Sequence, residues 1–305
     1  MLTDVQTASR SVNRNSTTMP LDWDLVPELR NPCLLLGFHG WSDAGSVASD
    51  TLEHLMDVLH PEVFATLKNE PFMHYTLDRP LGRIQDGIIL DLESPITQFR
   101  CRRNPSGKHD LIMGLGKEPQ LNWQLYCRVI LDLLERLAVK KVFTIGGVQD
   151  TISHTTPPQI SIVGTSESVI ADALSADPGL RTSEYYGPVS IHSFLLHTCR
   201  SNDVDAVSLW GHSPAYLQRN PRLVARLVTV LNTVIGTRCP VEGLLQKSIE
   251  LDRKISEALA KDPNLREFVE SIESKRRPTP SPTQGEKVIR IDEFLRRDPT
   301  KDPGS

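Results

Sequence analysis

A short apolar run, followed by glycines and then by a helical pattern, most constrains what this chain can fold into. The run is 34–36, and the next residues, 37–45, read Gly-Phe-His-Gly-Trp-Ser-Asp-Ala-Gly. A buried strand, a sharp glycine turn and a helix from about Ala44 form the opening unit of an α/β domain. Ligands of open α/β sheets bind at the carboxyl ends of the strands. The loop 38–45 is therefore the first place to look for function.

Two interpretations of this loop stay open. The first gives a role in contacting a ligand or a partner to the polar and aromatic side chains His39, Trp41, Ser42 and Asp43. In the second, the glycines satisfy the turn, Ser42 or Asp43 caps the helix, and Trp41 packs. Residue types alone favour the second. The loop fits neither the phosphate-binding glycine patterns nor the G-x-S-x-G pattern of a nucleophilic serine.

The order of strand, turn and helix recurs along the chain. Apolar runs predict strands at 34–36, 62–67, 111–113, 139–145, 160–163 and 204–210, and helical spacing predicts helices at 123–137, 166–174 and 221–235. Glycines at 146–147 and 211 are expected to end two of the strands, and a further helix is expected to open at 187–192, with Pro188 near its first turn. This pattern predicts an α/β fold with a mainly parallel sheet covered on both faces.

Four more polar residues follow predicted strands: Glu118, Asn122, His154 and His212. Because such residues meet at one edge of a parallel sheet, they are candidates to join the loop 38–45 in a single cleft. Asn122 is also placed to cap the helix that follows it. With no visible nucleophile partner, His154 is read first as a structural or surface histidine. Cys127 lies inside a predicted helix and is a poor nucleophile candidate.

Three further segments lie between the predicted strands 62–67 and 111–113. Residues 68–83 are rich in proline and polar residues and are read as a loop, and 88–92 as a strand near an edge. Residues 95–108 hold four basic side chains and are read as a solvated loop.

Composition excludes several classes. The net charge of −4 over 305 residues implies no bulk attraction to nucleic acid. No apolar run is long enough for a membrane span, and the N-terminus lacks the apolar core of a signal peptide. The cysteines are scattered without a C-x-x-C pair, which predicts reduced thiols in the cytoplasm and no metal site.

Composition also divides the chain. Residues 1–18 are polar and are read as a disordered lead-in, and 19–240 as the α/β core. Apolar residues at helical spacing predict a helical hairpin over 241–275, interrupted near Pro263, which docks on its own domain or on another subunit. Residues 276–305 form a proline-rich linker and tail.

Several of these segments together resemble the proteasome assembly chaperone 2 family, in its prokaryotic, actinobacterial-type branch. The matching pieces are 36–45, 116–123, 137–158, 187–192 and 207–216, and the helical pair is similar to the extension of that branch. The resemblance implies a three-layer α/β/α fold like that of nucleoside phosphorylases and peptidyl hydrolases. It also implies homo-oligomers, and its eukaryotic members help assemble the proteasome α-ring. The extra helices and the tail depart from those eukaryotic chaperones.

Two functions follow from these observations. The favoured one is a protein-binding or assembly factor without catalysis or cofactor, whose partners are protein subunits, with proteasome subunits among the candidates. The alternative is a hydrolase or nucleoside-phosphorylase-like enzyme, or a small-molecule binder, that uses the strand-end cleft. A shared fold does not by itself supply an activity, so the alternative rests on whether the candidate side chains converge.

Overall fold

The computed structural model describes residues 20–105 and 107–274. The expected lead-in 1–18 and the tail 276–305 lie outside these ranges. The strands are β1 (Leu21–Trp23), β2 (Cys33–His39), β3 (Glu62–Lys68), β4 (Leu81–Gln85), β5 (Ile88–Glu93), β6 (Ile96–Arg102), β7 (Leu111–Lys117), β8 (Lys141–Asp150), β9 (Ile160–Gly164), β10 (Arg181–Thr182) and β11 (Asp205–Pro214). The α-helices are α1 (Val47–Leu59), α2 (Trp123–Arg136), α3 (Glu167–Ala176), α4 (Ile191–Arg200), α5 (Pro221–Ile235), α6 (Glu242–Lys261) and α7 (Pro263–Ser274).

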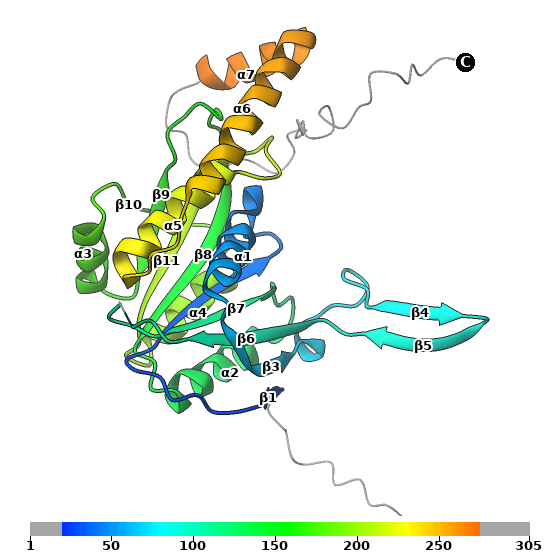
Figure 1. The fold of residues 1–305 in the computed structure, drawn as a ribbon, viewed down its shortest axis with the longest axis vertical. Helices are drawn as coiled ribbons and strands as arrows, with labels where there is room; N and C mark the ends of the chain where they lie inside the picture. The colour runs from blue at the N-terminus through cyan, green and yellow to red at the C-terminus, as the bar shows by residue number, and fades with distance from the viewer. Residues whose placement is uncertain (1–19, 106, 275–305) are drawn as a thin grey trace, which may run out of the picture.

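Nine of these strands form one twisted sheet in the order β1-β3-β6-β7-β2-β8-β11-β9-β10. The four strands at its centre, β7, β2, β8 and β11, run parallel to one another. Antiparallel pairs flank them, with β6 beside β7 and β9 beside β11. The parallel part of the sheet, which the sequence predicts, is therefore at its centre. The carboxyl ends of the four central strands lie along one edge (Figure 1).

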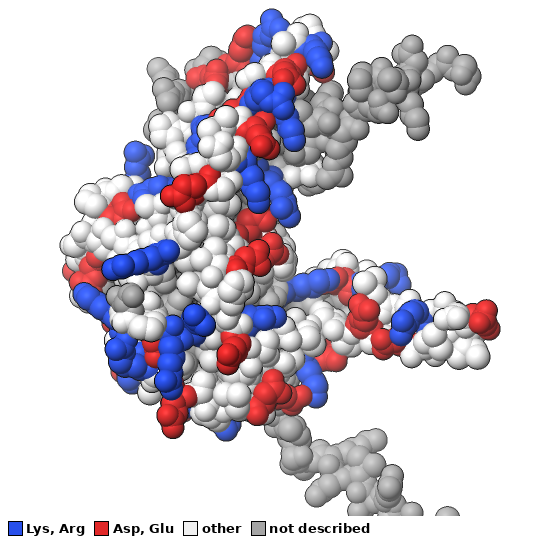
Figure 2. All heavy atoms as spheres, viewed as in Figure 1, with Lys and Arg blue, Asp and Glu red and all other residues white. Residues whose placement is uncertain are grey.

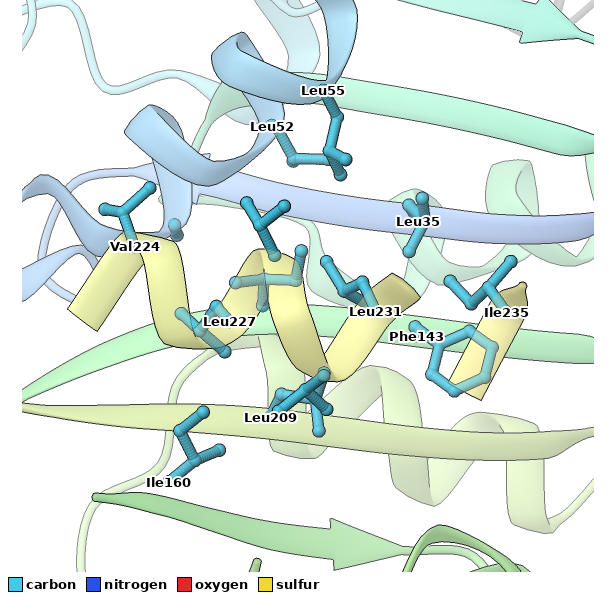
Figure 3. Packing of buried hydrophobic residues seen from close by; sticks show 14 of the residues in the cluster. Leu35, Leu52, Leu55, Phe143, Ile160, Leu209, Val224, Leu227, Leu231 and Ile235 are labelled. Atoms are coloured by element: carbon cyan, nitrogen blue, oxygen red, sulfur yellow. The ribbon is translucent and has the colours of Figure 1, made fainter. Parts of the chain in front are cut away.

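The apolar run at 34–36 becomes the middle of β2 because the sheet is covered on both faces. Leu34 and Leu36 belong to the core under α2 and α4, whereas Leu35 belongs to the core under α1, α3 and α5. All three side chains are fully buried. Figure 3 shows the second of these cores, with Leu35 facing Leu231 of α5. The three-layer α/β/α architecture is confirmed.

Two strands are longer than the sequence predicts. Gly146 and Gly147 do not end β8, and Gly211 does not end β11, because the two strands pair in register over ten residues each. The glycines mark close approaches instead. A Cβ atom on Gly146 would lie 2.7 Å from the ring of Trp210, and one on Gly147 would lie 2.4 Å from the carbonyl oxygen of Ala44.

The prediction of a solvated loop at 95–108 is wrong for its first half. Strand β6 occupies 96–102, inside the sheet, between β3 and β7. Its alternation was the missed signal, because Thr97 and Phe99 are buried while the basic residues Arg100 and Arg102 alternate with them. Two of the four basic residues thus lie on one face of a strand.

The strand expected at 88–92 forms, as β5, but it is not an edge of the large sheet. It pairs with β4, which begins at Leu81 within the segment predicted as a loop, and the two make a separate hairpin. The hairpin projects from the body of the molecule (Figure 1). The helix expected to open near Pro188 begins at Ile191.

The predicted helical hairpin forms as α6 and α7, with its break at Pro263. Its apolar side packs on its own chain, because Ile255, Leu265 and Val269 form a cluster with Tyr216 and Leu217, which follow β11. Within the ranges that the structure describes, no helix has the length and apolar character that crossing a membrane requires.

Candidate functional site

Strand β2 ends at His39, and the turn after it is held against the neighbouring strand. The N–H of Gly147 donates to the carbonyl of Ser42 at 2.7 Å, and Asp43 forms an isolated parallel bridge with Gly147. A short 3₁₀ turn, Ala44–Ser46, then leads into α1. The turn therefore continues the sheet past the end of β2 and fixes the direction in which its side chains point.

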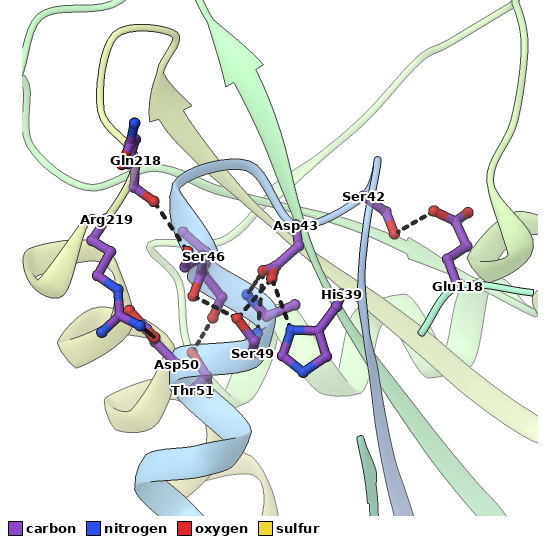
Figure 4. A network of polar contacts seen from close by, with 12 residues as sticks. His39, Ser42, Asp43, Ser46, Ser49, Asp50, Thr51, Glu118, Gln218 and Arg219 are labelled. Atoms are coloured by element: carbon purple, nitrogen blue, oxygen red, sulfur yellow. Dashed lines mark hydrogen bonds and ion pairs between the residues drawn. The ribbon is translucent and has the colours of Figure 1, made fainter. Parts of the chain in front are cut away.

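Asp43 is a helix cap. Its Oδ1 accepts hydrogen bonds from the N–H groups of Ala48 (2.8 Å) and Ser49 (3.1 Å), and its Oδ2 accepts from the Ser49 hydroxyl (2.6 Å). The side chain is 8% exposed, and this burial raises the pKa of its carboxyl group. Nδ1 of His39, whose side chain is half exposed, lies 3.9 Å from Oδ2 of Asp43 (Figure 4). The second interpretation of Asp43 thus has direct geometric support.

Ser42 joins three elements of the fold. Its hydroxyl donates to Oε2 of Glu118 (3.4 Å), which follows β7, and Nε2 of His192, in the first turn of α4, lies 3.2 Å from its Oγ. The N–H of Ile191 donates to the other carboxylate oxygen of Glu118 at 3.3 Å. Ser42 is 1% exposed and His192 is fully buried. Glu118 is therefore the link between the turn after β2 and the start of α4.

The hydrogen bonds of Ser42 run in the direction opposite to those of an activated serine, whose hydroxyl donates to the histidine. Because the Ser42 hydroxyl donates to Glu118, its oxygen accepts from His192, so Nε2 carries the proton. Nδ1 of His192 has no hydrogen-bond partner within the described ranges. Burial lowers the pKa of this histidine to about 3, and its ring packs between Phe38 and Trp210. The residue is a neutral donor and a poor general base at neutral pH.

Sequence reasoning missed His192 as a member of this group. It lies inside the segment 187–192 that carries part of the family resemblance, but it does not directly follow a predicted strand. Its partner Ser42 is 150 positions away. The only signal in the sequence was a histidine in the first turn of a predicted helix, which does not by itself indicate a function.

His212 and His154 lie in other surroundings. His212 lies on β11 and contacts the strands on both sides of it. Its Nδ1 is 2.9 Å from Oδ2 of Asp150 on β8, and its Nε2 is 2.9 Å from Oγ of Ser161 on β9. The hydrogen bond from His212 is the main reason that the pKa of Asp150 is lowered. His154 meets the Tyr216 hydroxyl through its backbone N–H (2.7 Å) and Nδ1 (2.9 Å), and burial lowers its pKa.

His154 and His212 line one small pocket at the start of α5, together with Asn220 and Arg222. Its volume is about 10 Å³, roughly that of one water position. A nucleoside-like substrate does not fit in a space of that size, since small-molecule sites measure roughly 300 Å³ or more.

The remaining two candidates stand alone. Trp41 is 71% exposed, so it is not packed in the turn. Asn122 occupies the N-terminal position of α2, as expected, but its side chain makes no cap; its amide donates to the carbonyl of Pro71. The eight candidates are thus brought together only in part: His39 with Asp43, Ser42 with Glu118, and His154 with His212.

The described ranges contain no group of three or more histidine, cysteine or acidic side chains arranged to hold a metal ion. The five cysteines are all free thiols. Burial raises the pKa of the Cys127 thiol to about 11, which keeps it protonated and unreactive at neutral pH.

Several large apolar side chains are exposed around this site. They are Trp41 in the turn after β2, Leu121 after Glu118, and Tyr185, Tyr186 and Val189 before α4. We call these five residues the strand-end surface. Their three segments are held together by the hydrogen bonds of Glu118 to Ser42 and Ile191.

Comparison with known proteins identifies the family. The model of the PAC2 family matches residues 37–259. The structure is similar to that of a proteasome-assembly chaperone homologue from Mycobacterium tuberculosis, at 27% identity over 78% of this chain and 99% of that one, with a TM-score of 0.68. It is also similar to a PAC2 family protein from Streptomyces avermitilis, at 28% identity over 73% and 95% of the two chains, with a TM-score of 0.64.

An archaeal proteasome activator from Pyrococcus furiosus shares the fold at 19% identity, over 78% of this chain and 97% of that one, with a TM-score of 0.64. No protein with a curated function matches the sequence. The family match covers most of the chain, and its fold is that of the two actinobacterial relatives. The chain belongs to the PAC2 family.

Proposed function

We propose that this chain is a protein-binding, assembly-chaperone-like member of the PAC2 family. It works as a homo-oligomer in the cytoplasm, and its partners are proteasome-related subunits. The observation that carries this proposal is the strand-end surface: the edge of the sheet where α/β proteins bind ligands presents exposed aromatic and aliphatic side chains.

The composition of this surface suits a protein partner. Tyr186 is fully exposed, Trp41 is 71% exposed and Tyr185 is 57% exposed. Tryptophan and tyrosine are enriched among the residues that dominate binding energy at protein interfaces. Three such side chains lie on segments that the hydrogen bonds of Glu118 hold together, so they are available to anchor an interface.

The polar groups beneath this surface support the same conclusion. The side chains of Ser42, Asp43 and Glu118 form hydrogen bonds with other parts of the same chain, and His192 is a buried neutral donor. Groups engaged in this way hold the scaffold in position, which is what a rigid binding surface requires.

Two relatives add weight to the choice of partner. One is described as a proteasome-assembly chaperone homologue and another as an archaeal proteasome activator. Five free thiols agree with a reducing compartment such as the cytoplasm.

The test is native mass spectrometry of the protein mixed with purified proteasome α subunits of the organism that encodes it. We expect a stoichiometric complex. Trp41→Ser and Tyr186→Ser should each weaken it at least about tenfold, the effect of losing roughly 1.4 kcal/mol. Ile249→Ser is the matched control, because Ile249 is an exposed apolar residue of α6 outside the strand-end surface. Failure to form a complex with any α subunit would refute the proposal, as would equal weakening by the control.

A further inference from the structure

Nothing in residues 20–105 and 107–274 covers the β4–β5 hairpin, which we call the arm. Every residue of both strands is exposed, including Leu81, Ile84, Ile88, Ile89, Leu90 and Leu92, which are between 52% and 70% exposed. The arm stands clear of the body in the space-filling view, and uncharged residues, drawn in white, cover much of it (Figure 2). A lone two-stranded hairpin is at best marginally stable in water, so an arm of this kind is stabilised by contact with something else.

The register of the hairpin gives it one apolar face. Leu92 pairs with Gly82, and Ile89 pairs with Ile84, two positions further along β4. Cross-strand partners share a face and alternate residues return to it, so Ile84, Ile89 and Leu92 lie on the same side. The register shift between Arg83 and Ile84 leaves Leu90 as an extra residue beside them. We call Ile84, Ile89, Leu90 and Leu92 the arm face.

The opposite face carries the charged residues of both strands beside Leu81 and Ile88, and we call it the polar face. Arg83 pairs there with Asp91, Leu81 with Glu93, and Gln85 with Ile88. The arm face itself carries no charged side chain. Two copies of the arm face can therefore meet without bringing like charges together, while the pairs on the polar face remain in water.

The exposed area sets the scale of the missing contact. The four side chains of the arm face expose roughly 450 Å², which already reaches the size of the largest apolar patch on a typical monomer. A patch of this size, on strands whose residues are all exposed, is large enough to form the apolar centre of a protein interface.

We infer that the arm face packs against the arm face of a second copy of this chain, in a two-fold symmetric contact. An apolar surface of this size needs a cover at all times, and a second copy is the partner that is always present in equal amount. Self-complementary contacts about a two-fold axis are also the commonest way in which identical chains associate. The inference names the contact surface for the homo-oligomer of the proposed function and rests on that part of it.

The first test changes the arm face and measures molar mass by sedimentation. The wild-type chain should sediment as a multiple of 34.1 kDa. Ile89→Lys combined with Leu92→Lys should lower the measured mass by about a factor of two or more, because a buried lysine pair facing its own copy repels it. Gln85→Lys adds a charge to the polar face of the same hairpin and should leave the mass unchanged. A wild-type monomer, or an unchanged mass in the double variant, would overturn the inference.

The second test traps the contact without removing it. Cys33, Cys127, Cys199 and Cys239 are buried, so a cysteine placed on the arm is far more accessible than these four. Ile89→Cys should give disulfide-linked dimers under mild oxidation, because the two arm faces meet near the symmetry axis. Arg83→Cys, on the opposite face, should give few. Equal trapping of both variants would show random collision and overturn the inference.

These outcomes separate the two proposals. If the arm variants become monomeric but still bind proteasome subunits through the strand-end surface, both proposals stand. If no proteasome subunit binds, the sedimentation and trapping results still decide the arm contact by themselves.

Discussion

Nε2 of His192 lies 3.2 Å from Oγ of Ser42, and this contact joins the turn after β2 to the first turn of α4. Both side chains are buried, and the carboxylate of Glu118 accepts a hydrogen bond from the serine hydroxyl. The serine hydroxyl is thus held between a donor and an acceptor. The three residues look like parts of a hydrolase, yet the direction of their hydrogen bonds suits a structural junction.

The buried His192 should make the fold sensitive to acid. Its pKa is about 3 in the folded protein, because burial disfavours the charged form, against roughly 6.5 in the unfolded chain. Between these values the unfolded chain binds the proton and the folded one does not. Stability is therefore lost as the pH falls below about 6.5, by up to roughly 1.4 kcal/mol per pH unit from this group.

Urea unfolding at about pH 7 and about pH 5.5 measures this effect. His192→Gln, which keeps a donor toward Ser42, should remove about 1 kcal/mol from the difference between the two conditions. His197→Gln, at an exposed position of the same helix, serves as the control and should leave the difference unchanged. An identical pH dependence in the His192→Gln variant would contradict the prediction.

Removing the carboxylate of Asp43 should destabilise the start of α1. Asp43→Ala leaves two backbone donors and the Ser49 hydroxyl without their acceptor, at a cost of about 2–3 kcal/mol. Asp43→Asn retains one acceptor oxygen and should cost less. The free energy of unfolding in urea measures both, with the exposed Asp57→Ala of the same helix as the control; a cost for Asp43→Ala no larger than that of the control would refute the prediction.

Gly147 should tolerate no side chain. A Cβ atom there would lie 2.4 Å from the carbonyl oxygen of Ala44, in the turn that carries the candidate site. Gly147→Ala should therefore destabilise the protein by at least about 3 kcal/mol, as overpacking against backbone does. Gly87→Ala, at the hairpin tip, meets nothing within 4 Å and strains only a positive φ of 77°, so it should cost about 1 kcal/mol. Thermal unfolding of the two variants side by side tests the order, and equal midpoints would speak against it.

His212 should hold down the pKa of Asp150. Its hydrogen bond is the largest influence that lowers that pKa. His212→Gln and His212→Asn both remove the imidazole ring. Either should bring the pKa of the Asp150 carboxyl back up toward its usual range near 3.9. Carbon-detected NMR titration of the Asp150 carboxyl follows the change directly. An unaltered titration curve would mean that Asp150 owes its low pKa to another group.

Some of the site was predictable from sequence, because local patterns carry it. The turn 38–45 had to follow a buried strand, and Asp43 was a recognisable cap for the helix after it. Helix α5 begins and ends where its apolar spacing predicts, and the break between α6 and α7 falls at Pro263. Each of these signals lies within a few residues of the structure that it specifies.

Contacts between distant segments could not be predicted from the sequence. The partners of Ser42 lie 76 and 150 positions away, and the strand β6 was hidden because its basic face resembled a solvated loop. The glycines of β8 looked like a strand end, whereas the ring of Trp210 and the carbonyl of Ala44 fill the space above them.

The sequence by itself determined the class of fold and the family, since periodicity and turn residues act locally and the matching segments keep their order. Tertiary structure alone decided which polar residues meet, which apolar residues stay exposed, and that β4 and β5 leave the sheet as a separate arm. These outcomes depend on how strands are ordered and paired across the sheet, and strand pairing is a property of the whole chain.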